Sequence, residues 1–190
     1  MLKLLIGLAL WSLAHVFKRM APGLRRDLSA SIGDKPSRGL ISLVLLGSAV
    51  LMFLGYRQAS FIAIYSPWPA IGYVTDILML PALFLAGIGS AGGRLSAKIR
   101  HPLLISVILW AFAHLLVNGD LASILLFGGL GLWAGVQILL INGHEGPWER
   151  PMPGNALQDW KLALASLFLF VVISGIHWLF NHNPFLGTYP

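Results

Sequence analysis

Six histidines lie in a chain that has few other polar side chains, and they are its main candidates for chemistry. Three of them, His15, His114 and His177, lie within long apolar segments. An ionisable side chain is costly inside a membrane, so each of the three indicates a functional site by default. Neutral imidazole is a common ligand of transition-metal ions. The alternative is a packing residue that forms a hydrogen bond to a neighbouring helix.

Two of these histidines occur in the same short sequence element. The chain reads Leu-Trp-Ser-Leu-Ala-His at 10–15 and Leu-Trp-Ala-Phe-Ala-His at 109–114. In a helix, a tryptophan four residues before a histidine lies on the same face, so we expect the two rings to be neighbours. The recurrence predicts two related halves of opposite topology, as in an inverted repeat. The alternative is coincidence, because leucine and alanine are common in any apolar helix.

Other polar residues are weaker candidates. Asp76 is the only acid well inside an apolar segment, where it suits a proton path, an ion pair with a histidine, or a wet position at the membrane surface. Arg100 and His101 form a cationic pair that suits an anionic headgroup, phosphate or carboxylate, or ordinary flanking of a membrane span. Glu145 and Glu149 lie in a later polar loop, where a solvated ion pair is the alternative to a ligand site.

The composition of the chain indicates a membrane protein, whose helices must position these residues. Of 190 residues, 57% are hydrophobic and only 11% are charged, whereas a soluble domain carries roughly a quarter charged residues. The apolar residues form long blocks without strand alternation, which favours helices. We therefore expect an all-α, polytopic membrane helical bundle of about six transmembrane helices, forming one domain over residues 1–190. The expected spans are 4–17, 40–56, 70–89, 102–117, 121–141 and 162–180.

Turn residues mark the start of two of these spans. Pro102 suits the first turn of a helix, where its missing N–H costs nothing. The sequence Asn-Gly-Asp at 118–120 is typical of a tight turn, and Asp120 is suited to cap the helix that follows.

Basic residues predict the orientation of the spans. The loops after the first, third and fifth expected spans hold eleven of them: Lys18, Arg19, Arg25, Arg26, Lys35, Arg38, Arg94, Lys98, Arg100, Arg150 and Lys161. The other side holds only Lys3 and Arg57. Because cytoplasmic loops are rich in lysine and arginine, we expect a bacterial inner-membrane protein with both termini in the periplasm. This topology also explains the net charge of +6 without a nucleic-acid partner, and leaves the lipid bilayer as the expected partner.

The chain has no cysteine, which excludes disulfides, thiolate ligands, covalent haem attachment and cysteine nucleophiles. No P-loop, GxSxG or HExxH element is present. Gly87, Gly89 and Gly92 have GxGxxG spacing, but we interpret them as loop and packing glycines rather than as a phosphate cradle. The sequence leaves the oligomeric state and enzymatic activity open.

The segment 100–128 resembles the core of the NnrU family, bacterial membrane proteins named from gene clusters for nitric oxide and nitrite metabolism. The resemblance rests on Arg-His-Pro at 100–102 and on Leu-Trp-Ala-Phe-Ala-His-Leu-Leu-Val-Asn-Gly-Asp at 109–120, and it extends to the histidine of the first span. It implies an inner-membrane protein of denitrification metabolism.

The NnrU family is similar to the 15-cis-zeta-carotene isomerases of plants and cyanobacteria, which are haem b enzymes. This similarity implies haem b as the cofactor, His15 and His114 as its iron ligands, and isomerisation of a lipid-soluble polyene as a second candidate activity. Depth in the membrane gives an alternative ligand. At about 1.5 Å per residue, His15 and His114 differ in depth by more than roughly 10 Å. By depth alone, His177 is a better partner for His114.

A more distant likeness, to membrane methyltransferases of the isoprenylcysteine carboxyl type, also runs through Arg100 and His101. There the matching region and a pair of acids help to bind S-adenosylmethionine, which implies Arg100, His101, Glu145 and Glu149 as cofactor-binding residues. A leucine stands where those enzymes often have a tyrosine, and the two glutamates are separated, which weakens this alternative. A third hypothesis is a non-enzymatic accessory protein whose histidines are packing residues.

Overall fold

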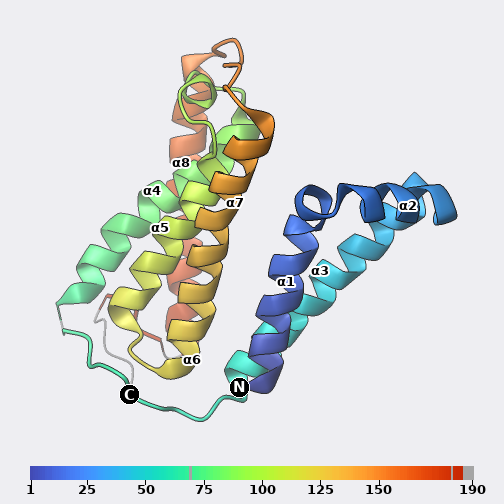
Figure 1. The fold of residues 1–190 in the computed structure, drawn as a ribbon. Coiled ribbons are helices and arrows are strands. Elements are labelled where there is room, and N and C mark those ends of the chain that lie inside the picture. The colour runs from blue at the N-terminus through green and yellow to red at the C-terminus, as the bar shows by residue number, and fades with distance from the viewer. Residues whose placement is uncertain (69, 181, 186–190) are drawn as a thin grey trace. The chain divides into compact units, whose positions relative to one another are not determined.

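The computed structural model describes residues 1–68, 70–180 and 182–185, and these are almost entirely helical or in short connections (Figure 1). Within these ranges no strand forms, and the only extended pairing is an isolated bridge between Ala63 and Asp120. The chain divides into two compact units, residues 1–62 and 63–190, each described by itself below. The prediction of an all-α helical architecture is confirmed.

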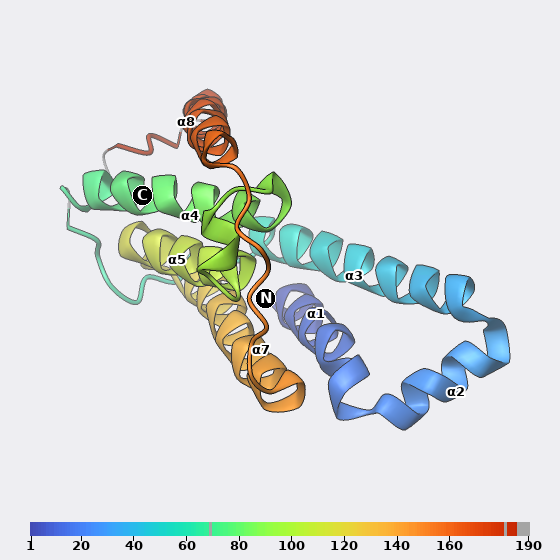
Figure 2. The same ribbon diagram turned by 90° about the horizontal axis from the view of Figure 1, so that it is seen from above.

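Unit 1 contains three helices: α1 (Leu2–Met20), α2 (Pro22–Ile32) and α3 (Asp34–Arg57). Helices α1 and α3 pack along each other (Figure 2). Two glycines allow the backbones to come close. A Cβ added at Gly7 would lie 2.8 Å from the backbone nitrogen of Met52, and one at Gly55 would collide with the backbone of the fully buried Leu4. Small residues at such contacts are typical of helix pairs in membranes.

Helix α2 corrects the expectation of a polar loop between the first two spans. The chain turns by 94° between α1 and α2, and Pro22 occupies the first turn of the new helix. Leu24, Leu28 and Ile32 recur every four residues and form an apolar stripe along it. The helix ends at Gly33, whose φ of 89° favours glycine. The many polar residues of this segment reflect an amphipathic helix rather than a loop.

Unit 2 contains the remaining helices: α4 (Ile71–Ala91), η1 (Leu95–Ala97), α5 (Pro102–Val117), α6 (Leu121–Ser123), the π-helical turn η2 (Ile124–Gly128), α7 (Gly129–Glu145) and α8 (Ala156–Leu179). Helix α4 packs against α8 and α5, and α5 packs against α7. The long helices therefore lie in the order α8, α4, α5, α7 (Figure 2). As predicted, Pro102 begins α5, and Asp120 caps α6 by accepting a hydrogen bond from the backbone N–H of Ser123 at 3.0 Å.

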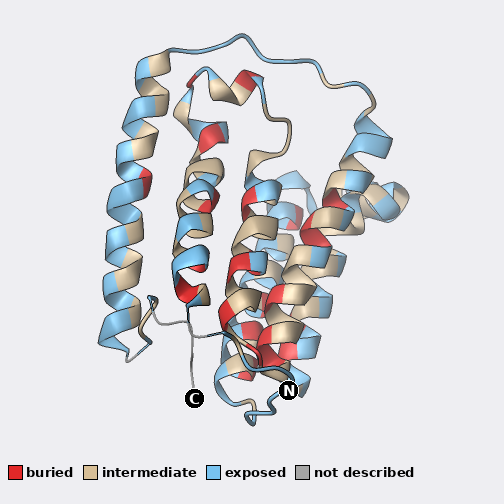
Figure 3. Ribbon diagram, turned by 90° about the vertical axis from the view of Figure 1, so that its left-hand side faces the viewer, coloured by how far each residue is buried: buried red, intermediate tan, exposed pale blue. Residues whose placement is uncertain are grey.

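Most residues of these helices are exposed or intermediate, and the buried ones are few (Figure 3). Many large apolar side chains are exposed. Leu132, Leu139, Phe168 and Leu179 are all among the exposed apolar side chains. A water-soluble protein does not expose so much contiguous apolar surface, so these side chains are suited to lipid.

Among the described residues, four helical segments are long and apolar enough to cross a membrane by themselves: Asp34–Arg57, Ile71–Ala91, Leu121–Glu145 and Ala156–Leu179. The bent pair of α1 and α2 counts as a fifth candidate. Helix α5 is apolar but has only 16 residues. The chain is therefore a multi-pass membrane protein, and four to five of the six expected spans meet the length criterion.

The helices extend beyond the predicted spans. Helix α1 has 19 residues, where the apolar block alone predicted 4–17, and α8 begins at Ala156, six residues before the predicted start. The added residues include charged ones, among them Lys18, Arg19 and Asp159, which suit the membrane surface rather than the hydrocarbon layer. Glu145, expected in a loop, is instead the last residue of α7.

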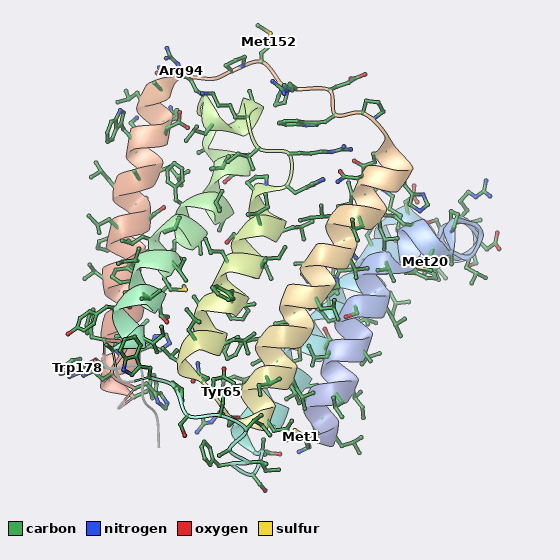
Figure 4. The ribbon with its side chains drawn as sticks, turned by 60° about the vertical axis from the view of Figure 1, so that its left-hand side comes forward. Met1, Met20, Tyr65, Arg94, Met152 and Trp178 are labelled. Atoms are coloured by element: carbon green, nitrogen blue, oxygen red, sulfur yellow. The ribbon has the colours of Figure 1, made fainter. Side chains whose placement is uncertain are left out.

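One end of unit 2 is closed by a contact between the loop after α4 and the segment that leads into α8. The Asp159 carboxylate accepts a hydrogen bond from the backbone N–H of Arg94 at 2.9 Å. The N–H of Gly154 donates to the carbonyl of Gly93 at 3.3 Å. Arg94 and Met152 lie at this end in Figure 4, whereas Tyr65 and Trp178 lie at the opposite end. Two of the three loops predicted to be cytoplasmic thus meet at one end of the unit.

Candidate functional site

The imidazole of His114 lies among aromatic rings in the last turn of α5. Its centroid is 4.6 Å from that of Phe127, with the rings nearly parallel, and 5.0 Å from that of Trp110. Trp110 and Phe127 also contact each other edge to face at 5.0 Å. Trp110 comes from the preceding turn of α5, and the buried Phe127 comes from the π-helical turn η2. Isolated π turns occur frequently at functional sites.

A backbone hydrogen bond fixes the tautomer of His114. Its Nδ1 lies 2.9 Å from the carbonyl oxygen of Trp110. A carbonyl can only accept, so Nδ1 carries the proton and donates it. In the neutral ring, Nε2 then holds the lone pair. Within the described part of the chain, Nε2 of His114 has no hydrogen-bond partner. Metal-binding histidines have this same arrangement, in which the second ring nitrogen donates to a carbonyl.

The two copies of the repeated sequence element have the same local geometry. Nδ1 of His15 lies 2.9 Å from the Trp11 carbonyl oxygen, as Nδ1 of His114 does from that of Trp110. The ring centroids are 4.5 Å apart and tilted by 44° in the first copy, and 5.0 Å apart and tilted by 51° in the second. The expected contact between tryptophan and histidine is therefore confirmed. His15 belongs to unit 1 and His114 to unit 2.

His177 is the second imidazole of unit 2 that lies near this site. Its Nδ1 is 2.8 Å from the carbonyl oxygen of Ile173, so it has the same tautomer as His114. It lies in the last turn of α8. Its neighbour Trp178 is at the end of the unit that also holds Tyr65 (Figure 4).

The Asn-Gly-Asp turn anchors the end of α5 that carries His114. The Asn118 side chain donates to the carbonyl of His114 at 2.8 Å, and its backbone N–H donates to the same oxygen at 3.0 Å. The hydroxyl of Tyr65 donates to the carbonyls of Leu115 and Asn118. A Cβ at Gly119 would collide with the carbonyl of Tyr65, so the turn requires glycine there. The segment before α4 is thus tied to the end of α5.

Tyr65 lies outside the membrane spans, and its phenol titrates abnormally. Burial, and then the charge of Asp120, raise the pKa of the Tyr65 hydroxyl above its ordinary value. Because the pKa of this hydroxyl is higher in the folded than in the unfolded protein, its contribution to stability is fully present at pH values below the pKa of the unfolded state. The contribution is lost as the pH rises through the pKa of the folded state. At neutral pH the hydroxyl is protonated, as in any tyrosine, and donates to α5.

Two further polar groups lie inside spans of unit 2. One carboxylate oxygen of Asp76, on α4, is inaccessible to solvent and has no hydrogen-bond partner among the described residues. The Gln137 side chain on α7 is 3% exposed, and its amide nitrogen also has no partner there. Sequence reasoning singled out Asp76 and missed Gln137. An amide within a long apolar block was the available signal.

Arg100 and His101 lie at the opposite end of α5 from His114. His101 is the N-cap residue of α5, and its Nε2 lies 2.8 Å from the side-chain oxygen of Asn142 on α7. This hydrogen bond joins the two helices, a structural role that the sequence did not reveal. Among the described residues, no three histidine, aspartate or glutamate side chains come together as a metal site.

The fold and this site define a multi-pass helical membrane protein with a fixed imidazole at one end of its bundle. The chain belongs to the NnrU family, because the family model described as NnrU protein matches residues 3–184, across both units. The predicted family is therefore confirmed. Comparison with the curated proteins and with the solved structures gives no match.

Proposed function

We propose that this NnrU-family protein binds haem b non-covalently, with Nε2 of His114 as an axial ligand of the iron. One observation carries the proposal. The hydrogen bond from Nδ1 to the Trp110 carbonyl directs the lone pair of the neutral ring to Nε2, which has no partner in the described chain. Imidazole is an established haem ligand, and a chain without cysteine has no thiolate or covalent alternative.

We take His177 as the opposite ligand. It shares unit 2 with His114 and has the same Nδ1 hydrogen bond to a backbone carbonyl. His15 is the ligand that the resemblance to the carotene isomerases implies, and it has the same hydrogen bond in unit 1. The two candidates are distinguished by the substitutions described in the Discussion.

The protein residues around His114 would orient and shield this group. Asn118 holds the end of α5 that carries the ligand, and Phe127 and Trp110 fix the plane of the imidazole. Apolar surroundings of this kind tune the iron and control solvent access to it. Bound haem b supplies an iron that changes oxidation state and binds small molecules such as nitric oxide. We propose nitric oxide and nitrite metabolism as its setting, with isomerisation of a lipid-soluble polyene as the second candidate.

A visible absorption spectrum tests this proposal directly. Protein purified from cells supplied with haem precursors is expected to be coloured and to show the sharp reduced bands of an iron with two imidazole ligands. The haem should extract into acidified organic solvent, because no cysteine is present to hold it covalently. A colourless protein would contradict the proposal and favour the accessory role. Calorimetry with S-adenosylmethionine then tests the methyltransferase alternative.

We also propose a bacterial inner-membrane location with both termini in the periplasm. The contact between Gly93 and Gly154 supports it, because it brings two predicted cytoplasmic loops to one end of unit 2. An alkaline phosphatase fused after Pro190 should be active, and a fluorescent protein inserted at Gly154 should fold in the cytoplasm. Exchanging the two reporters provides the control. An inactive phosphatase at the C-terminus together with fluorescence there would reverse the topology.

A further inference from the structure

A basic hollow lies in unit 1. It is lined by residues of α1, α2 and α3, and Figure 1 shows α2 crossing the ends of the other two helices. It has a volume of about 640 Å³, and its lining residues are Lys18, Arg25, Arg26, Ser29, Asp34 and Arg38. Four of the six are cationic and only one is acidic. The hollow is therefore suited to an anion, and all of its lining residues belong to unit 1.

Arg25 is held in place within this hollow by two serines. Its Nη1 donates to the hydroxyl oxygen of Ser37 at 3.0 Å and also donates to that of Ser29. Ser37 is completely buried, and its own hydroxyl donates to the carbonyl of Asp34 at 2.9 Å. The Ser37 oxygen is thus available to accept from Arg25. A guanidinium has five N–H donors, so the three that are not on Nη1 are left for a ligand.

This arrangement differs from a simple flanking charge. A lysine or arginine that only marks the cytoplasmic side of a span needs no fixed orientation. A guanidinium that is oriented by a buried hydroxyl loses less entropy when it binds, and its planar fork matches the oxygens of a phosphate group. The other cations of the hollow add charge at the same place.

The position of α2 indicates which phosphate compound would reach the hollow. The helix lies at 94° to α1, across the start of the membrane-spanning α3. Leu24 and Ile32 on its apolar stripe are 63% and 44% exposed, and the adjacent Met20 is 68% exposed. An amphipathic helix with an uncovered apolar stripe lies in the membrane interface, at the depth of the lipid headgroups. The hollow beside it then opens where lipid phosphates are concentrated.

We propose that the hollow formed by α1, α2 and α3 is a binding site for the phosphate headgroup of an anionic phospholipid. The lipid phosphate contacts Arg25 and the neighbouring cations, and the acyl chains lie beside the apolar stripe of α2. The excess of positive charge selects an anionic lipid over a zwitterionic one, because the positively charged amine of a zwitterionic headgroup would be repelled. This site is independent of haem binding.

Native mass spectrometry of the detergent-solubilised full chain tests the proposal, with short-chain phosphatidylglycerol and phosphatidylcholine as probes. We expect phosphatidylglycerol to bind at least tenfold more tightly than phosphatidylcholine. Joint replacement of Arg25→Gln and Arg38→Gln should weaken phosphatidylglycerol binding about tenfold or more. The matched control is Arg94→Gln with Lys98→Gln, which removes the same charge from a loop of unit 2 and should leave the affinity unchanged. Arg25→Lys keeps the positive charge that orients the protein in the membrane. It should still weaken lipid binding several-fold, because lysine lacks the planar guanidinium group.

Three results would overturn the proposal. Equal binding of the two lipids would show that the positive charge of the hollow does not select an anionic headgroup. Equal losses in the Arg25/Arg38 and Arg94/Lys98 variants would show that binding depends on overall charge rather than on this hollow. Complete displacement of the lipid by millimolar inorganic phosphate would identify a site for free phosphate instead.

Discussion

Replacement of His114 by alanine should abolish the haem absorption spectrum of the purified protein while the protein still inserts into the membrane. The reason is that alanine removes Nε2, the proposed iron ligand, but leaves α5 tied to its neighbours through Asn118 and Tyr65. The measurement is the ratio of haem absorbance to protein, together with the elution profile of the detergent-solubilised variant. A variant that keeps the full spectrum would contradict His114 as a ligand.

The second ligand is identified by a matched pair of substitutions. His177→Ala should remove the low-spin spectrum, whereas His15→Ala should leave it unchanged, because we assign the opposite ligand to His177. Both histidines have the same hydrogen bond from Nδ1 to a backbone carbonyl, so both substitutions remove this bond. The reverse result would establish the pair that the resemblance to the carotene isomerases implies.

Gly55→Ala should destabilise unit 1 by about 1–3 kcal/mol, the usual cost of overpacking. Its Cβ would collide with the backbone of Leu4 on α1, and a backbone cannot move aside as a flexible side chain can. The two helices would have to separate. Unfolding of the detergent-solubilised protein by increasing sodium dodecyl sulfate, followed by circular dichroism, measures the change.

Gly47→Ala is the control for this substitution. Gly47 lies on the same helix, and a Cβ there meets nothing within 4 Å. Alanine is favoured over glycine within a helix by roughly 0.5–1 kcal/mol, so this variant should be as stable as the wild type or more stable. Equal destabilisation by the two substitutions would show that close packing against Leu4 is not the cause.

Local sequence signals predicted those features of the fold that depend on neighbours along the chain. The apolar blocks located the main helices. The cap formed by Asp120 could also be predicted, because a capping side chain contacts a backbone N–H only three residues further along the chain. The contacts of Trp11 with His15 and of Trp110 with His114 follow from four-residue spacing alone.

Features that depend on distant residues could not be predicted in this way. Phe127 lies 13 positions after His114, and its ring stacks on the imidazole from η2, a π turn for which the sequence has no clear signal. The hydrogen bond between His101 and Asn142 similarly joins two separate helices. Helix α2 was missed for a different reason, because its charged residues concealed a stripe of only three apolar side chains.

The π turn between α6 and α7 has a consequence for how this family can gain or lose residues. A π turn accommodates one residue more than an α-helical turn, so it absorbs an insertion without rotating the helix beyond it. Elsewhere in a span, deletion of one residue would rotate every later side chain by about 100° around the axis. Within 124–128, a deletion would instead restore a regular α-helix and keep Trp133 and Gln137 on their buried side. Relatives one residue shorter there should retain the bundle but lose the stacking of the aromatic ring on His114.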